Sequence, residues 1–147
     1  MKSKAEIVVE TLLHYNSKNR GYNISEDHCT YLDKATGNKC AVGRCILDSE
    51  IENVAKFEEK YIYNTANSSP NVESLANRFL NLDSLLKPEY RGHDVKFWKN
   101  LQNLHDLSSM WTEDGFILSE SNISFISASF GKEVADAVNI AFAEKTA

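Results

Sequence analysis

The three cysteines of the chain, Cys29, Cys40 and Cys45, lie close together in the sequence. A thiolate is both a strong nucleophile and a metal ligand, so this cluster is the first place to look for chemistry. Cys40 directly precedes Ala41-Val42-Gly43, where small residues allow another backbone to approach closely. We therefore consider Cys40 as a candidate nucleophile, with the amide of Gly43 as a candidate oxyanion donor. The alternative is that Cys40 is a small apolar residue buried in the core.

A cysteine nucleophile needs a base, and His105 is the candidate. The spacing of Leu101, Leu104 and His105 predicts that His105 lies on the apolar face of a helix. Its neighbour Asp106 completes a candidate catalytic set, but residues at i and i+1 do not face each other on a helix. Asp106 is therefore expected to be a poor orienting group for His105. The alternative for His105 is a core histidine that is hydrogen bonded to a backbone carbonyl.

A binding site without catalysis is also compatible with this part of the sequence. Gly43 and Arg44 follow Cys40, and Trp98 lies on the same predicted helix as His105. If the cysteine segment meets that helix, Gly43, Arg44 and Trp98 are the candidate ligand-binding residues of a groove between them. Aromatic residues such as Trp98 also serve as core residues, which is the alternative for it.

Zinc binding is a third possibility for the cysteines. Cys29, Cys40 and Cys45 with either His28 or His105 would make a four-coordinate Cys₃His site. The spacing is unfavourable, because residues five apart on a strand point to opposite faces unless the strand is broken. The sequence therefore gives no firm metal site, and no cofactor is expected.

Composition limits the class of protein. The chain has 147 residues and a formal net charge of −5, which argues against a general nucleic-acid binder. No apolar run is long enough to span a bilayer, and the acidic residues of the N-terminal segment do not fit a signal peptide. We expect a cytoplasmic protein, without membrane or nucleic-acid partners, in a single domain spanning residues 1–147.

The periodicity of apolar residues predicts an α+β fold that is predominantly helical. Five or six helices are expected to pack around a small cysteine-bearing β-hairpin within residues 29–47, with Gly37 in its turn. The expected helices cover residues 4–17, 49–59, 70–86, 94–110, 120–130 and 132–145. Capping boxes at Ser3–Glu6 and Ser49–Glu52 and an N-cap at Asp94 set three of their starts.

Two short motifs carry a resemblance. The first is Gly37-Asn-Lys-Cys40-Ala-Val-Gly43 and the second is Leu101-Gln-Asn-Leu-His105-Asp106, followed by Trp111. Together they resemble a group of small uncharacterised phage and bacterial proteins. The resemblance covers about half the chain, and it implies a small cytosolic protein of phage or mobile-element type, in the host cytoplasm if it is phage-encoded. It implies no reaction, and a shared fold would place the same residues together.

Three functions follow from these observations. The first is an accessory protein that binds a host protein or a small-molecule ligand. The second is a cysteine-dependent hydrolase or transferase using Cys40 and His105. The third is a structural zinc module. The sequence does not decide whether the protein is an enzyme, and it leaves the oligomeric state open.

Overall fold

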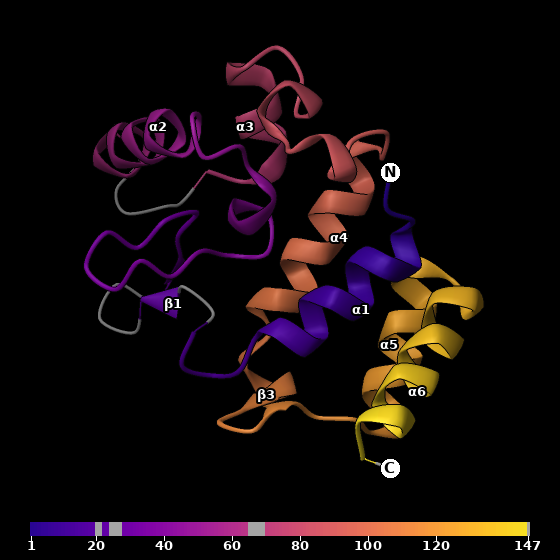
Figure 1. Ribbon diagram of the computed structural model, residues 1–147. Helices are drawn as coiled ribbons and strands as arrows, with labels where there is room; N and C mark the ends of the chain where they lie inside the picture. The colour runs from indigo at the N-terminus through magenta and orange to yellow at the C-terminus, as the bar shows by residue number, and fades with distance from the viewer. Residues whose placement is uncertain (20–21, 24–27, 65–69, 147) are drawn as a thin grey trace.

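The computed structural model of the protein describes residues 1–19, 22–23, 28–64 and 70–146 (Figure 1). Within them the chain forms six α-helices and two very small antiparallel sheets, which confirms the predicted α+β, predominantly helical class. The helices are α1 (Lys4–His14), α2 (Ile51–Asn64), α3 (Val72–Arg78), α4 (Val95–Asp106), α5 (Glu120–Phe130) and α6 (Lys132–Thr146). Four short 3₁₀ turns join them: η1 (Gly43–Cys45), η2 (Asp83–Leu85), η3 (Pro88–Tyr90) and η4 (Ser108–Met110).

Two helix starts follow the capping residues that the sequence predicts, whereas α2 begins at Ile51, two residues after Ser49, and α3 has Asn71 as its N-cap. The Ser3 side chain accepts the N–H of Glu6, and the Glu6 side chain accepts the N–H of Ser3, so α1 opens with a complete capping box. The Asp94 carboxylate accepts the N–H of Phe97 at 2.9 Å and caps α4.

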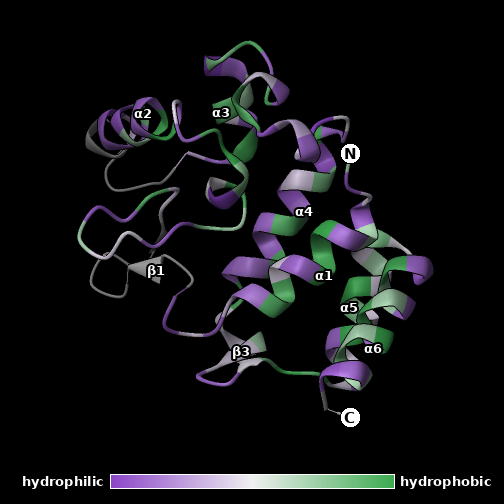
Figure 2. Ribbon diagram, in the orientation of Figure 1, coloured by the Kyte–Doolittle hydropathy of each residue, from purple (hydrophilic) through white to green (hydrophobic). Residues whose placement is uncertain are grey.

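The helices are arranged around α1 and α4 (Figure 1). Helices α5 and α6 pack side by side, α1 packs on α6, and α4 contacts both α5 and α3. Helices α2 and α3 lie at the end of the molecule away from α5 and α6. Figure 2 shows hydrophobic and hydrophilic residues alternating along α1 and α4, as in helices with one face in the core. The buried apolar side chains form one cluster that includes Trp98, the largest fully buried side chain.

Each sheet has two short strands. Strand β1 (Tyr22–Asn23) pairs with β2 (His28–Cys29), and β3 (Trp111–Thr112) pairs with β4 (Gly115–Phe116). The second pair closes the turn that Asp114-Gly115 predicts.

The structure departs from the hairpin predicted over residues 29–47 in the second arm of that hairpin. The N–H of Cys40 donates to the carbonyl of Thr30 at 3.2 Å, and Gly37 has a φ of +77° in the turn between them. Beyond Cys40, however, the chain forms a turn and then η1, and Ile46 makes an antiparallel bridge to Leu86. Residues 40–43 are all buried, so they lack the alternation that a strand with one buried face requires. The apolar run is therefore a loop that fills the core rather than a strand.

The expected helix over residues 70–86 is also shorter in the structure. Helix α3 ends at Arg78, and Leu80 adopts a φ of +74° that ends any helix. The apolar residues Leu82, Leu85 and Leu86 reach the core instead from a bend, a 3₁₀ turn and the β-bridge to Ile46, respectively. The buried apolar residues of 70–86 therefore have helical spacing, although the segment is not one continuous helix.

Among the described residues, no helix combines the length and the apolar character needed to cross a membrane.

Candidate functional site

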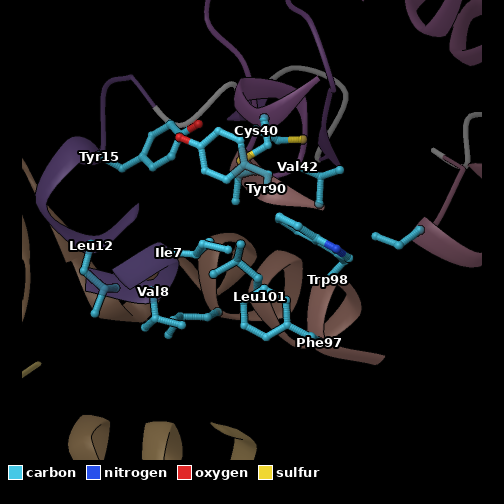
Figure 3. Close-up of a cluster of buried hydrophobic side chains, with 14 of the residues drawn as sticks. Ile7, Val8, Leu12, Tyr15, Cys40, Val42, Tyr90, Phe97, Trp98 and Leu101 are labelled. Atoms are coloured by element: carbon cyan, nitrogen blue, oxygen red, sulfur yellow. The ribbon is translucent and has the colours of Figure 1, made fainter. Parts of the chain in front are cut away.

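Cys40 lies in the hydrophobic core. Its exposed fraction is 1%, and Figure 3 shows it in a cluster with Tyr15, Val42 and Trp98. Burial raises the pKa of the Cys40 thiol well above its ordinary value, and the negative charges of Asp106 and Glu58 add to this effect. Hydrogen bonds from nearby amides oppose it without reversing it. Cys40 is therefore a protonated thiol at neutral pH, not the thiolate that nucleophilic catalysis uses.

Gly43 holds the cysteine loop tightly against the preceding segment. A Cβ atom at position 43 would lie 2.1 Å from the carbonyl oxygen of Tyr31, so the backbones meet in a way that glycine alone allows. The N–H of Gly43 donates to the Sγ of Cys40 at 3.3 Å. In this conformation the amide considered as an oxyanion donor already has an acceptor within the loop.

His105 and Asp106 contact each other directly, contrary to the sequence-based argument. The Nδ1 of His105 lies 2.8 Å from the Oδ1 of Asp106. The helical rule fails because Asp106 is the last residue of α4 and Leu107 is already extended, so its side chain can turn back. The Nε2 of Gln102 donates to the same oxygen at 2.8 Å. His105 is fully buried, while the side chain of Asp106 is 42% exposed.

Two bridges connect this pair to the cysteine loop. The Oε1 of Gln102 accepts the N–H of Val42 at 3.4 Å. The ring of His105 packs edge-on against Tyr15, with ring centroids 4.8 Å apart, and the hydroxyl of Tyr15 donates to the carbonyl of Lys39 at 2.7 Å. The structure thus brings the predicted catalytic residues into one region, through contacts that belong to a packed core. Their catalytic role stays a prediction.

The three predicted ligand-binding residues lie in different environments. Gly43 is buried, and Trp98 has no exposed surface. Arg44 is part of a charged cluster at the edge of α1, where its Nη1 lies 2.6 Å from the Oε1 of Glu10 and 3.4 Å from the hydroxyl of Tyr90. Lys2 and Tyr90 also hydrogen bond to Glu10. Of the three residues, Arg44 is the one that borders a surface groove, of about 560 Å³.

The zinc hypothesis needs the side chain of Cys29 and, in one of its two forms, that of His28, and both lie outside the described part of the structure. Among the described side chains, no group of three His, Cys, Asp or Glu residues could hold a metal ion. Burial raises the pKa of Cys45 to about 12, and its thiol donates to the carbonyl of Ala41 at 3.5 Å.

A second groove, which the sequence analysis missed, lies between α2 and α3. Its volume is about 710 Å³. Basic and aromatic side chains dominate its lining, which consists of Asn53, Lys56, Phe57, Glu59, Lys60, Arg78 and Phe79. Lys56 and Lys60 are four residues apart, so they share one side of α2, and this spacing is visible in the sequence. That α3 lies opposite them is a tertiary contact that no local pattern indicates.

Comparisons with protein-family models, with curated proteins and with solved structures gave no match for this chain.

Proposed function

We propose that this protein is an accessory factor that acts by binding another protein without covalent chemistry. The proposal rests on one contrast in exposure. Cys40 and His105, which have the side chains best suited to catalysis, are buried in the core. The basic residues of the α2–α3 groove are instead exposed, and its aromatic residues are half-buried. A protein that presents charged and aromatic side chains while burying its nucleophile is suited to recognition rather than catalysis.

The resemblance to small phage and bacterial proteins adds a suggestion about the partner. In a protein of that type, the partner would be a protein of the host cell. The α2–α3 groove supports a protein partner, because its lining is mixed in polarity whereas pockets for small molecules are mostly apolar.

Thiol alkylation measured separately at each cysteine tests the absence of covalent chemistry. We expect iodoacetamide to modify Cys40 in the native protein far more slowly than in the urea-unfolded protein, because the thiol is buried and protonated. Mass spectrometry of the digested chain gives each rate. A Cys40 that reacts faster in the native protein than in the unfolded one would favour the cysteine-dependent hydrolase or transferase instead.

A peptide-display selection tests binding itself. The native protein is immobilised and exposed to a random peptide library, and the enriched peptides are measured in solution by fluorescence anisotropy. We expect a family of related peptides that bind the native protein and not the unfolded chain. Enrichment of no such family would contradict the proposed function.

A further inference from the structure

Leu80 has an unusual combination of backbone conformation and exposure. Its side chain is 93% exposed, and its φ is +74°, in the left-handed region that favours glycine. The backbone conformation costs stability because a non-glycine residue is strained there, and the exposed leucine side chain gains no stability from burial. Strain of this kind clusters at ligand clamps and other functional sites. Leu80 therefore calls for a functional explanation, since the fold gains nothing from its side chain.

The turn around Leu80 is held in place by hydrogen bonds. The N–H of Asn81 donates to the carbonyl of Phe79 at 2.9 Å. The hydroxyl of Ser84 lies 3.2 Å from the carbonyl of Phe79 and 2.9 Å from that of Asn81. These contacts fix the backbone on the C-terminal side of Leu80, so its side chain is presented to solvent by an ordered turn.

Leu80 directly follows two residues that line the α2–α3 groove, Arg78 and Phe79. The guanidinium of Arg78 lies 5.2 Å from the ring centroid of Phe79, and the ring of Phe79 lies 5.9 Å from that of Phe57 across the groove. The paired rings of Phe57 and Phe79 form the apolar part of the groove surface, and the next residue in the chain, Leu80, adds an exposed apolar side chain to it. We call this surface, made of Lys56, Phe57, Lys60, Arg78, Phe79 and Leu80, the α2–α3 face.

The α2–α3 face carries a positive charge on an acidic protein. Within the described part of the chain, Lys56, Lys60 and Arg78 form no ion pair. Among the described residues of the groove lining Glu59 is the one acidic residue, and its Oε1 lies 2.8 Å from the Nζ of Lys34, with which it forms an ion pair. The whole chain has a formal net charge of −5, so the charge of this face is opposite in sign to that of the whole chain. Charge complementarity favours a negatively charged occupant.

We propose that the α2–α3 face binds an acidic segment of the partner protein. Carboxylates of that segment pair with Lys56, Lys60 and Arg78, and its apolar side chains pack on Phe57 and Phe79. Leu80 packs against an apolar side chain of the same segment, which explains an exposed side chain on a strained and ordered turn. This inference rests on the proposed function and adds the location and the chemistry of the binding site to it.

The test uses the peptides enriched by display on the wild-type protein. The first variant combines Lys56→Glu, Lys60→Glu and Arg78→Glu, and Lys96→Glu is the control because Lys96 is an exposed lysine on α4, away from the face. We expect enriched peptides to be rich in Asp, Glu and apolar residues. Their affinity should fall by about tenfold or more in the triple variant and stay unchanged in Lys96→Glu. Added salt should weaken binding to the wild type.

A second variant, Leu80→Gly, separates binding from folding. Glycine removes the side chain and relieves the left-handed backbone, so we expect the thermal midpoint to rise or stay constant while peptide affinity falls. Loss of binding by a fully folded variant cannot result from unfolding. Unchanged affinity in Leu80→Gly would overturn the role of this residue.

The remaining outcomes distinguish the two proposals. Specific peptides whose affinity the triple variant leaves unchanged would overturn the α2–α3 face and leave the proposed function standing. A labelled single-stranded oligonucleotide is measured alongside the peptides. One outcome is that no peptide binds, while the oligonucleotide binds the wild type and not the triple variant. In that case the α2–α3 face binds a nucleic acid, and this inference is wrong.

Discussion

The carboxylate of Glu58 accepts the backbone N–H of Tyr31 through both of its oxygens, at 3.1 and 3.2 Å. This contact connects α2 to the segment that leads into the cysteine loop. Glu58 is 3% exposed, and its burial raises its pKa to about 7, while the amide of Tyr31 lowers it and the charge of Glu59 raises it further. The carboxyl group that holds this segment therefore titrates close to neutral pH.

The first prediction concerns Glu58 and pH. Because the folded-state pKa of about 7 exceeds the ordinary value of 4.5, the folded protein binds the proton more tightly than the unfolded chain. The contribution of Glu58 to the unfolding free energy is therefore complete at pH values below its pKa in the unfolded chain. It is lost as the pH rises through its folded-state pKa of about 7. Relative to Glu58→Gln, which does not titrate, the wild type should lose up to about 3 kcal/mol of unfolding free energy across this range. Urea unfolding at a series of pH values measures the difference, and a constant difference would contradict a raised pKa.

The second prediction concerns Glu10, whose pKa has the opposite shift. Burial alone would raise this pKa, but hydrogen bonds from Lys2, Tyr90 and Arg44 outweigh it and lower the pKa to about 2. The stability from Glu10 is therefore present above its unfolded pKa and is lost as the pH falls toward about 2. We expect Glu10→Gln to cost about 2 kcal/mol at neutral pH, because it removes a charged acceptor, and progressively less in acid.

Glu89→Gln is the control for this second prediction, since Glu89 has an exposed side chain in the same region. Urea unfolding of both variants at neutral pH and at about pH 3 gives the comparison. A loss for Glu10→Gln that is equal at both pH values would show that its charge is not responsible.

The third prediction concerns Gly43. In Gly43→Ala the new methyl group would overlap the carbonyl oxygen of Tyr31, and because that oxygen belongs to the backbone the clash cannot be relieved by a rotamer change. We expect a loss of more than about 3 kcal/mol, at the severe end of the range for single substitutions. Gly37→Ala is the control, because Gly37 has a φ of +77° but no heavy atom within 4 Å of the place that a methyl group would occupy. It should cost about 1 kcal/mol, and equal losses in thermal unfolding would count against close approach as the cause.

The fourth prediction concerns the N-cap of α4. Asp94→Ala removes the acceptor for the N–H of Phe97 and should cost about 1 kcal/mol. Asp94→Asn keeps a capping side chain and should cost much less. Chemical unfolding of the two variants measures both effects. Equal losses would mean that the charge of Asp94, and not its capping hydrogen bond, stabilises the helix.

The sequence predicts the features of this fold that depend on neighbouring residues. The capping residues Ser3 and Asp94 act within a single helical turn, and the apolar spacing of Leu101, Leu104 and His105 correctly places them on the buried face of α4. Gly37 is likewise found in the left-handed region that a turn requires. In each case the decisive interaction lies within a few residues of chain.

The features that the sequence did not predict depend on the end of an element or on tertiary contact. Asp106 reaches His105 because α4 ends there, and a helical rule does not apply to a terminal residue. The segment after Cys40 does not pair as a hairpin arm, because Ile46 pairs with Leu86, which is distant in the chain. The α2–α3 face needs Phe57 and Phe79 to meet, and no local pattern contains that contact.

The close contact between Gly43 and Tyr31 also affects what can be inferred when the Cys-Ala-Val-Gly run occurs in another protein. Each of its positions has a packing role: Cys40, Ala41 and Val42 fill the core, and Gly43 admits the neighbouring carbonyl. Selection for folding alone is enough to preserve such a run through evolution. A protein that shares it would be recognised as a relative in architecture, while its biological role would have to be inferred from the residues on its surface.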